Sequence, residues 1–324
     1  MHCQMKSARA TSATPRPQRV RFNTSTMKLQ IEHITRYRYT PGVDTALHMA
    51  YLQPEHSATQ SLLSHVLQVF PAPTQTHHST DVYGNTRTYL ALAEPHAQLQ
   101  VSATSVVQTS PPGLVDNTRA WEPAREHFQF RAGSRYDPAT EFVFASPFAP
   151  RHADFLDYAL PSFAPGTALL PAVHDLMCRI HNEFEYAPLS TEVDTPALQA
   201  LEQRMGVCQD FAHIMIACLR SLGLPARYVS GYLLTEPPPG QPRLLGADAS
   251  HAWVSVFVPA ESGDTASYWV DFDPTNNRWG RGSPGVDYVR LASGRDYGDI
   301  SPLRGVIYGG AQHTLDVEVT VSPF

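Results

Sequence analysis

The first part of the chain alternates apolar and polar residues with a period of two, which is the pattern of half-buried strands. Leu29 and Ile31 begin this alternation, and residues 99–107 repeat it before a Pro-Pro-Gly sequence ends the run. Residues 82–85 have the composition of a turn between strands. Since no helical periodicity competes here, residues 27–110 are predicted to form an N-terminal β domain.

The second half of the chain begins with helical patterns. Over residues 167–180 the apolar positions recur at intervals of three and four. Residues 195–201 predict a short second helix, with a threonine cap and a proline in its first turn. A third helix over about 207–222 has the clearest pattern, because Gly223 supplies a left-handed C-cap and Pro225 prevents continuation.

Strand-like runs follow these helices. They cover residues 226–234, 251–259 and 268–273, and residues 314–321 alternate again as a closing strand. Helices followed by antiparallel strands predict an α+β fold for a catalytic core over residues 166–324. Between the two regions, residues 111–165 are rich in Pro, Phe and Arg without a clear period, and we expect a connector there.

Length and charge narrow the class of protein. The 324 residues suggest two domains, and 42% hydrophobic with 17% charged residues is typical of a globular protein. The net charge of −6 argues against a broadly basic nucleic-acid binder and against attraction to anionic membranes. No run of apolar residues is long enough to span a bilayer. The sequence leaves the oligomeric state open.

Residues 1–26 differ in composition from the rest of the chain. They carry five basic residues and no acid, which leaves the remainder at −11. Their Ser, Thr and Arg content is that of a transit peptide, without the apolar segment of a secretory signal. The alternative is that the natural start is Met27, with a disordered or misassigned segment upstream. In both cases this leader is excluded from the predicted fold.

The four cysteines are Cys3, Cys178, Cys208 and Cys218. No two form a C-x-x-C pair, so the sequence suggests neither a zinc ribbon nor a disulfide framework. Reduced thiols in a cytoplasmic protein are therefore expected. Cys208 stands at the start of the third predicted helix, where free N–H groups and the helix dipole favour a thiolate. Cys218 lies on the apolar face of that helix, and Cys178 is expected to pack as well.

A nucleophilic cysteine requires a base and a group that orients the base. His251 opens the strand over 251–259, and Asp271 and Asp273 share one face of the strand over 268–273. Strand parity allows either carboxylate to face the histidine across the sheet. Asp271 and Asp273 with Asn276 also suggest a cation site, but the remaining ligands and the glycine of a calcium loop are missing.

Four ordered blocks resemble the bacterial transglutaminase-like family of papain-like cysteine enzymes. They are residues 206–213 (GVCQDFAH), 223–232 (GLPARYVSGY), 250–254 (SHAWV) and 272–276 (FDPTN). The resemblance extends to the N-terminal β region and to residues 294–297 (GRDY). It implies a triad with Cys208 as nucleophile, His251 as base and Asp273, rather than Asp271, as the orienting carboxylate.

The resemblance implies acyl transfer from an amide through a thioester, without a metal or cofactor. The expected substrate is a peptide or a small amide, and hydrolysis and transfer to an amine both stay open. The backbone N–H of Cys208 is a natural oxyanion donor, and Tyr186 is a candidate second donor for which a role in the core is the alternative. A hypothesis from another class is a binding or scaffolding module with the same fold and no turnover.

Three further features of the sequence need an interpretation: the residues near the candidate triad, a glycine-rich motif and a pair of histidines. Trp253, Trp269 and the loop over 235–250 lie close in sequence to His251 and Asp273, so they are expected to shape the cleft. Residues 280–285 spell G-x-G-x-x-G, but a proline stands where a helix would begin, so a loop is predicted instead of a dinucleotide site. His77 and His78 are expected to be a solvated pair.

Overall fold

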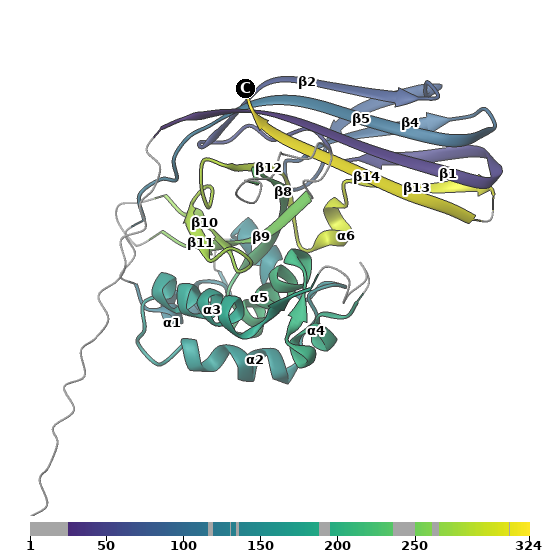
Figure 1. Ribbon diagram of the computed structural model, residues 1–324. Coiled ribbons are helices and arrows are strands. Elements are labelled where there is room, and N and C mark those ends of the chain that lie inside the picture. Colours follow the sequence, from purple (N-terminus) through teal and green to yellow (C-terminus); the bar gives the residue numbers. More distant parts are fainter. Residues whose placement is uncertain are drawn as a thin grey trace, which may run out of the picture.

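The computed structural model describes residues 25–115, 119–129, 131–133, 136–187, 195–235, 250–260, 266–310 and 312–324. Residues 1–24, which make up nearly all of the predicted leader, lie outside the described residues, as does the loop over 236–249. Figure 1 shows three layers: a long N-terminal sheet, a smaller core sheet beneath it, and a group of helices below that sheet. The predicted α+β fold class is confirmed.

The N-terminal sheet is built around one long strand, β1. Its seven strands in the described part of the chain are β1 (Met27–Ala50), β2 (Gln60–Phe70), β3 (Gln75–Thr80), β4 (Thr86–Leu92), β5 (His96–Thr109), β13 (Leu303–Gly309) and β14 (Gln312–Pro323). The first half of β1 pairs with β5 and β14, and its second half pairs with β4 and β13. Along β5, buried and partly buried residues alternate, as the period-two pattern predicted.

The closing strand over 314–321 exists as β14, but it closes the N-terminal sheet and not the core sheet. Leu29 of β1 pairs with Pro323, and Thr40 pairs with Gln312. A chain division at residue 166 therefore does not separate the two sheets. The local pattern could show only that this segment is a strand, because its partner lies almost 300 residues earlier in the chain.

The core consists of an antiparallel sheet in the order β11-β10-β9-β8-β12 with helices on one face. Its strands are β8 (Ala226–Leu233), β9 (Ser250–Val258), β10 (Tyr268–Asp273), β11 (Arg278–Arg281) and β12 (Tyr288–Gly294). The two long helices of the described residues are α3 (Leu169–Glu183) and α5 (Cys208–Ser221), the shorter α4 (Ala197–Gln203) lies between them in the chain, and a short α6 (Tyr297–Ile300) follows β12. Pro196, not Thr195, occupies the N-cap position of α4, so the predicted threonine cap was wrong.

The segment expected to be an irregular connector contributes helices to the core. It forms α1 (Trp121–His127), α2 (Ala153–Ala159) and the 3-10 turns η1 (Pro138–Val143) and η2 (Leu160–Ser162). Phe155 and Phe163 are buried in the same apolar cluster as α5. Helices of seven residues show little 3.6-residue periodicity of their own. The equally short α4 was predicted with the help of the Thr-Pro sequence at its start, and no such sequence precedes α1 or α2.

The two sheets share one apolar core. Leu29, Ile31, Val107, Val319 and Val321 from the N-terminal sheet belong to the same buried cluster as the apolar face of α5. The N-terminal sheet is therefore packed onto the core rather than tethered to it. Among the described helices, none combines the length and apolar character needed to cross a membrane.

Candidate active site

Helix α5 begins at Cys208, as the sequence predicted, and its first turn is held by a buried carboxylate. Asp210 accepts a hydrogen bond from the backbone N–H of Val207, with 2.8 Å between Val207 N and Asp210 Oδ2. Gly206 leaves room for this carboxylate, since a Cβ at Gly206 would lie 2.6 Å from Asp210 Oδ2. The Gly-Val-Cys sequence thus fixes the sulfur of Cys208 at a helix N-terminus, where free N–H groups and the dipole favour negative charge.

Two short paired strands fix the backbone just before Cys208. In β6 (Glu185–Tyr186) and β7 (Met205–Gly206), Tyr186 pairs with Gly206, and Ala187 N donates to Gly206 O at 2.9 Å. Tyr186 is 52% exposed, so the alternative of a core role for it was wrong. Burial of part of its ring and the nearby charges of Cys208 and Asp273 raise the pKa of Tyr186. Its hydroxyl therefore stays protonated at neutral pH.

His251 and Asp273 meet across adjacent strands of the core sheet. His251 stands near the start of β9 and Asp273 at the end of β10, with 2.8 Å between His251 Nε2 and Asp273 Oδ2. The side chain of Cys208 lies close enough to His251 to contribute to raising the pKa of the imidazole. Because Nε2 is used by Asp273, Nδ1 is the ring nitrogen that remains for the sulfur. The structure therefore brings the three residues nominated from the sequence into one chain of contacts.

The electrostatics of this group favour a charged histidine. Burial by itself lowers the pKa of His251, but the carboxylate of Asp273 and the side chain of Cys208 raise it to about 10. Burial likewise raises the pKa of Asp273, while His251, Tyr288 and Asn276 together hold it below its ordinary value. At neutral pH the site thus contains an imidazolium in contact with the sulfur, stabilised by an ionised carboxylate.

Besides His251, Asp273 accepts hydrogen bonds from several other donors. Its Oδ1 accepts from the backbone N–H groups of Thr275 (2.9 Å) and Asn276 (3.2 Å). Its Oδ2 accepts from the Tyr288 hydroxyl (2.6 Å) and from Asn276 Nδ2 (2.8 Å). The sequence pattern did not nominate these two side-chain partners. Asn276 belongs to the FDPTN block, and membership of that block is the sequence feature that could have identified it as a partner of Asp273. Tyr288 comes from β12, and no sequence feature pointed to it.

Asp271 has different partners, although it lies on the same face of β10. Its Oδ2 accepts from Trp253 Nε1 at 3.1 Å and from a guanidinium nitrogen of Arg290. Neither contact reaches His251, so the structure separates the two carboxylates that strand parity left open. In the described part of the chain, no group of three or more His, Cys, Asp or Glu side chains is arranged to hold a metal ion.

The other described cysteines lack the setting of Cys208. Cys218 is fully buried in the core, and burial raises its pKa. Cys178 is partly buried, and burial together with Asp175 raises its pKa, although Cys178 donates to Asn277 Oδ1 at 3.3 Å. All three described cysteines are free thiols.

The residues expected to shape the cleft have different outcomes. Trp253 is buried in the sheet against Asp271 and its ring lies 6.1 Å from the His251 ring, so it does lie beside the candidate triad. Trp269 lies at the opposite end of β10 from Asp273, 5.0 Å from the Phe257 ring. Most of the loop over 235–250 lies outside the described residues. The glycine-rich residues 280–285 form the end of β11 and the loop to β12 with no helix after them, and His77 and His78 are exposed on β3.

Comparison with family models gives two matches along the chain. Residues 29–108 match the bacterial transglutaminase-like N-terminal region, and residues 159–274 match the transglutaminase-like superfamily. The second match contains Cys208, His251 and Asp273. The first covers most of β1 to β5.

Similar proteins occur in bacteria. The uncharacterized protein Rv2569c of Mycobacterium tuberculosis is 41% identical over 309 residues, which cover 92% of this chain and 94% of that protein. A protein-glutamine gamma-glutamyltransferase of Pseudomonas aeruginosa is 31% identical over 108 residues, or 31% of this chain and 15% of that protein. A crystal structure from Cytophaga hutchinsonii, described provisionally as a cysteine protease, superposes with a TM-score of 0.69. It is 22% identical and covers 92% of this chain and 91% of its own.

Proposed function

The chain belongs to the bacterial transglutaminase-like family, and we propose that it is a cysteine enzyme that transfers the acyl group of an amide through a thioester. The observation that carries the proposal is the contact chain from Cys208 to His251 and on to Asp273, with 2.8 Å between His251 Nε2 and Asp273 Oδ2. A nucleophile, a base and a group that orients the base are the parts that such a reaction requires.

In the proposed first step, the Cys208 thiolate attacks the carbonyl carbon of the amide. A carbon–sulfur bond forms, and the carbonyl π electrons move onto the oxygen. The C–N bond then breaks, the departing nitrogen takes its proton from the His251 imidazolium, and a thioester remains. In the second step, neutral His251 removes a proton from water or an amine, which attacks the thioester and releases the Cys208 thiolate. Asp273 keeps the ring oriented and stabilises its charged form.

The negative oxygen of the tetrahedral intermediate needs hydrogen-bond donors. The backbone N–H of Cys208 is suited to this role because it lies at the N-terminus of α5, where no intrahelical acceptor uses it. We propose the Tyr186 hydroxyl as the second donor. Its half-exposed position beside Gly206 and its raised pKa support a protonated hydroxyl that a substrate can reach.

The substrate is proposed to be a peptide or small amide. The P. aeruginosa relative, a protein-glutamine gamma-glutamyltransferase, supports glutamine side chains as one candidate acyl donor, and water and amines are both possible acceptors. The free state of the three described cysteines supports action in the cytoplasm.

The proposal is tested by screening glutamine peptides and small amides for ammonia release and for incorporation of a labelled amine. Cys208→Ala is expected to abolish both signals, while Cys178→Ala, which removes the other partly exposed thiol, is expected to retain them. Iodoacetamide should alkylate Cys208 faster at neutral pH than Cys178, because only Cys208 contacts the imidazolium. Turnover by Cys208→Ala would overturn the mechanism. An unreactive Cys208 in a protein without turnover would instead indicate a silent binding module.

A further inference from the structure

A second polar site lies on the other face of the core sheet, away from α5. Tyr228 of β8 packs against His213 of α5, so the neighbouring Arg227 projects to the opposite face. There it lines a cavity of about 490 Å³ between the core sheet and the loop that precedes β2. Arg227 pairs with Ser255, four positions along β9 from His251, which corresponds to about 13 Å along the strand. The cavity is therefore distinct from the site at Cys208.

Three arginines line this cavity: Arg227, Arg281 and Arg290. The charge of Arg290 is already matched, since its Nε lies 3.1 Å from Glu55 Oε1 and its Nη2 binds Asp271. Two carboxylates thus face three guanidinium groups. Neither Arg227 nor Arg281 forms an ion pair with a described residue, although Asp271 and Glu55 are near enough to Arg227 to act against the lowering of its pKa.

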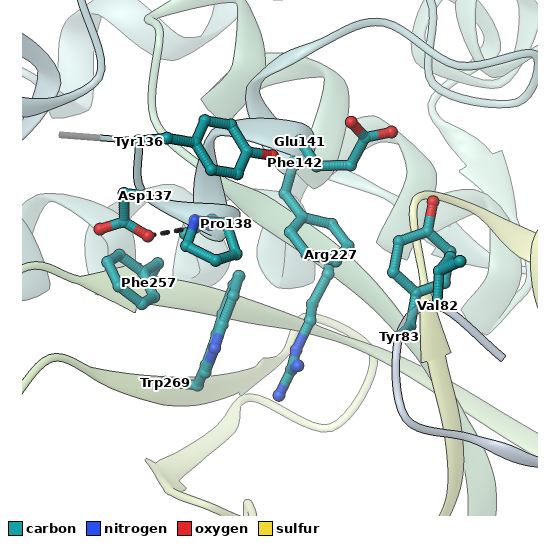
Figure 2. A pocket seen from close by; sticks show the side chains of 11 residues that line it. Val82, Tyr83, Tyr136, Asp137, Pro138, Glu141, Phe142, Arg227, Phe257 and Trp269 are labelled. Carbon is teal, nitrogen blue, oxygen red and sulfur yellow. Dashed lines mark hydrogen bonds between the residues drawn. The ribbon is translucent and has the colours of Figure 1, made fainter. Parts of the chain in front are cut away.

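Arg227 is the less accessible of these two cations. Its Nε atom is buried and has no hydrogen-bond partner among the described residues. Its guanidinium group stacks over Trp269, 4.1 Å from the ring centroid. Figure 2 looks into a neighbouring pocket that Arg227 also lines, and it shows the guanidinium end pointing away from Glu141 and Tyr136 of that pocket, so Glu141 does not neutralise it. Burying a charged donor without a partner is costly unless a ligand satisfies it.

Arg281 stands at the mouth of the same cavity. It is exposed, and its guanidinium group lies 4.2 Å from the centroid of the Tyr268 ring. Its backbone is fixed, because Arg281 O accepts from Gly113 N at 3.0 Å and the next residue, Gly282, accepts from Thr59 Oγ1 at 2.9 Å. A partly buried guanidinium with a buried Nε atom and an accessible guanidinium, each stacked on an aromatic ring, therefore border one cavity.

We propose that this cavity binds an oxyanion, the carboxylate or phosphate group of a small ligand, between Arg227 and Arg281. Planar guanidinium groups bind both kinds of oxyanion through paired N–H donors. A volume of about 490 Å³ lies within the range of pockets that take small molecules. Burial and the charge of Arg290 lower the pKa of Arg227 to about 9, so it still carries its charge at neutral pH.

The test is calorimetric titration of the full chain with inorganic phosphate and, separately, with glutarate, at pH 7.5 and constant ionic strength. Saturable binding of at least one anion is expected. Arg227→Gln and Arg281→Gln should each weaken it about tenfold or more, because each removes a charge-assisted hydrogen-bond donor. Arg38→Gln is the matched control: Arg38 is an exposed arginine on β1 outside this cavity, and its replacement makes the same change in net charge.

The two anions distinguish the sources of the ligand group. Tighter binding of phosphate identifies a phosphate ligand, and tighter binding of glutarate identifies a carboxylate. The proposal is wrong if neither anion binds saturably, or if all variants, including Arg38→Gln, bind equally well. Arg281 is exposed, and its guanidinium group stacks on Tyr268 at the surface rather than inside the core. Arg281→Gln should therefore fold and decide the question even if Arg227→Gln does not.

Discussion

At the scale of single residues, the site shows how partners give two similar carboxylates different chemistry. Asp271 and Asp273 are both fully buried and lie on one face of β10. Asp273 binds His251, whereas Asp271 binds Trp253 and Arg290. The proposed reaction therefore depends on Asp273, and the packing of the sheet depends on Asp271.

Asp273→Asn is expected to lower kcat by about 100-fold or more, with little change in KM. An amide does not stabilise the imidazolium, and it can hold the ring in the wrong tautomer. The measurement is steady-state hydrolysis of whichever amide the screen identifies. Thermal unfolding of the same sample shows whether the fold is retained.

Asp271→Asn is the matched control, and the opposite outcome is expected for it. It should retain most of the kcat but lose about 1–3 kcal/mol of unfolding free energy, because buried Arg290 loses a charged partner. Equal loss of kcat in both variants would contradict distinct roles for the two carboxylates.

The sequence could nominate most of the candidate site but not its supports. Cys208 stands out because the start of a helix can be read locally, and the family resemblance selects Asp273 over Asp271. Tyr288 and Asn276 also bind Asp273, yet neither was nominated as its partner, and Asn276 was considered only for a cation site. Tyr288 reaches it from β12, and such a contact depends on how the strands assemble rather than on any local pattern.

At the scale of elements, α5 is the clearest case in which local signals suffice. The sequence predicted a helix over about 207–222, and the structure has one from Cys208 to Ser221, followed by Gly223 with a φ of +80°. The start of the helix is equally constrained, since Asp210 Oδ2 would lie only 2.6 Å from a Cβ on Gly206. The position of the sulfur therefore depends on a glycine two residues before it.

Gly206→Ala is expected to displace the Asp210 carboxylate and loosen the first turn of α5. The expected loss is about 1–3 kcal/mol of unfolding free energy, because a buried hydrogen bond is disturbed and a close contact is created. Alkylation of Cys208 by iodoacetamide should also slow, since the sulfur shifts relative to His251. Gly113→Ala is the control, because a Cβ there meets its nearest neighbour at an ordinary 3.4 Å. A Gly206→Ala protein with unchanged stability and reactivity would show that the helix start does not depend on this glycine.

Elements whose stability comes from distant contacts were predicted less well. The short helices α1 and α2 were missed because seven residues carry little periodicity and, unlike the equally short α4, neither follows a Thr-Pro sequence. Their position is set by tertiary contacts instead. Trp121 Nε1 of α1, for example, donates to Ala164 O at 3.2 Å, and Arg179 of α3 donates to Tyr158 O of α2 at 2.7 Å. The final strand was predicted as a strand, but its pairing with β1 required the folded molecule.

At the scale of the whole molecule, several histidines are buried where they cannot easily take up a proton. Burial lowers the pKa of His33 to about 4, and burial with His96 nearby lowers the pKa of His48 to about 4. Burial and the charge of Arg220 lower the pKa of His213 to about 3. His251 differs, since Asp273 and Cys208 overcome burial and raise its pKa to about 10.

These shifts predict that stability declines on both sides of neutral pH. Below pH 6.5 the unfolded chain binds protons that His33, His48 and His213 cannot bind in the folded state. Each of these three histidines should therefore lower the free energy of unfolding by about 1–2 kcal/mol as the pH falls from 6.5 to 5. The stabilising contribution of His251 has the opposite pH dependence: it is fully present below pH 6.5 and is lost as the pH rises towards 10.

Urea unfolding at a series of pH values from 5 to 9.5 measures the loss of stability on the acid side and on the alkaline side. His33→Gln should flatten the acid limb, and replacement of the exposed His77 should not. A profile that stays level from pH 6.5 down to 5 would show that the buried histidines take up protons in the folded protein.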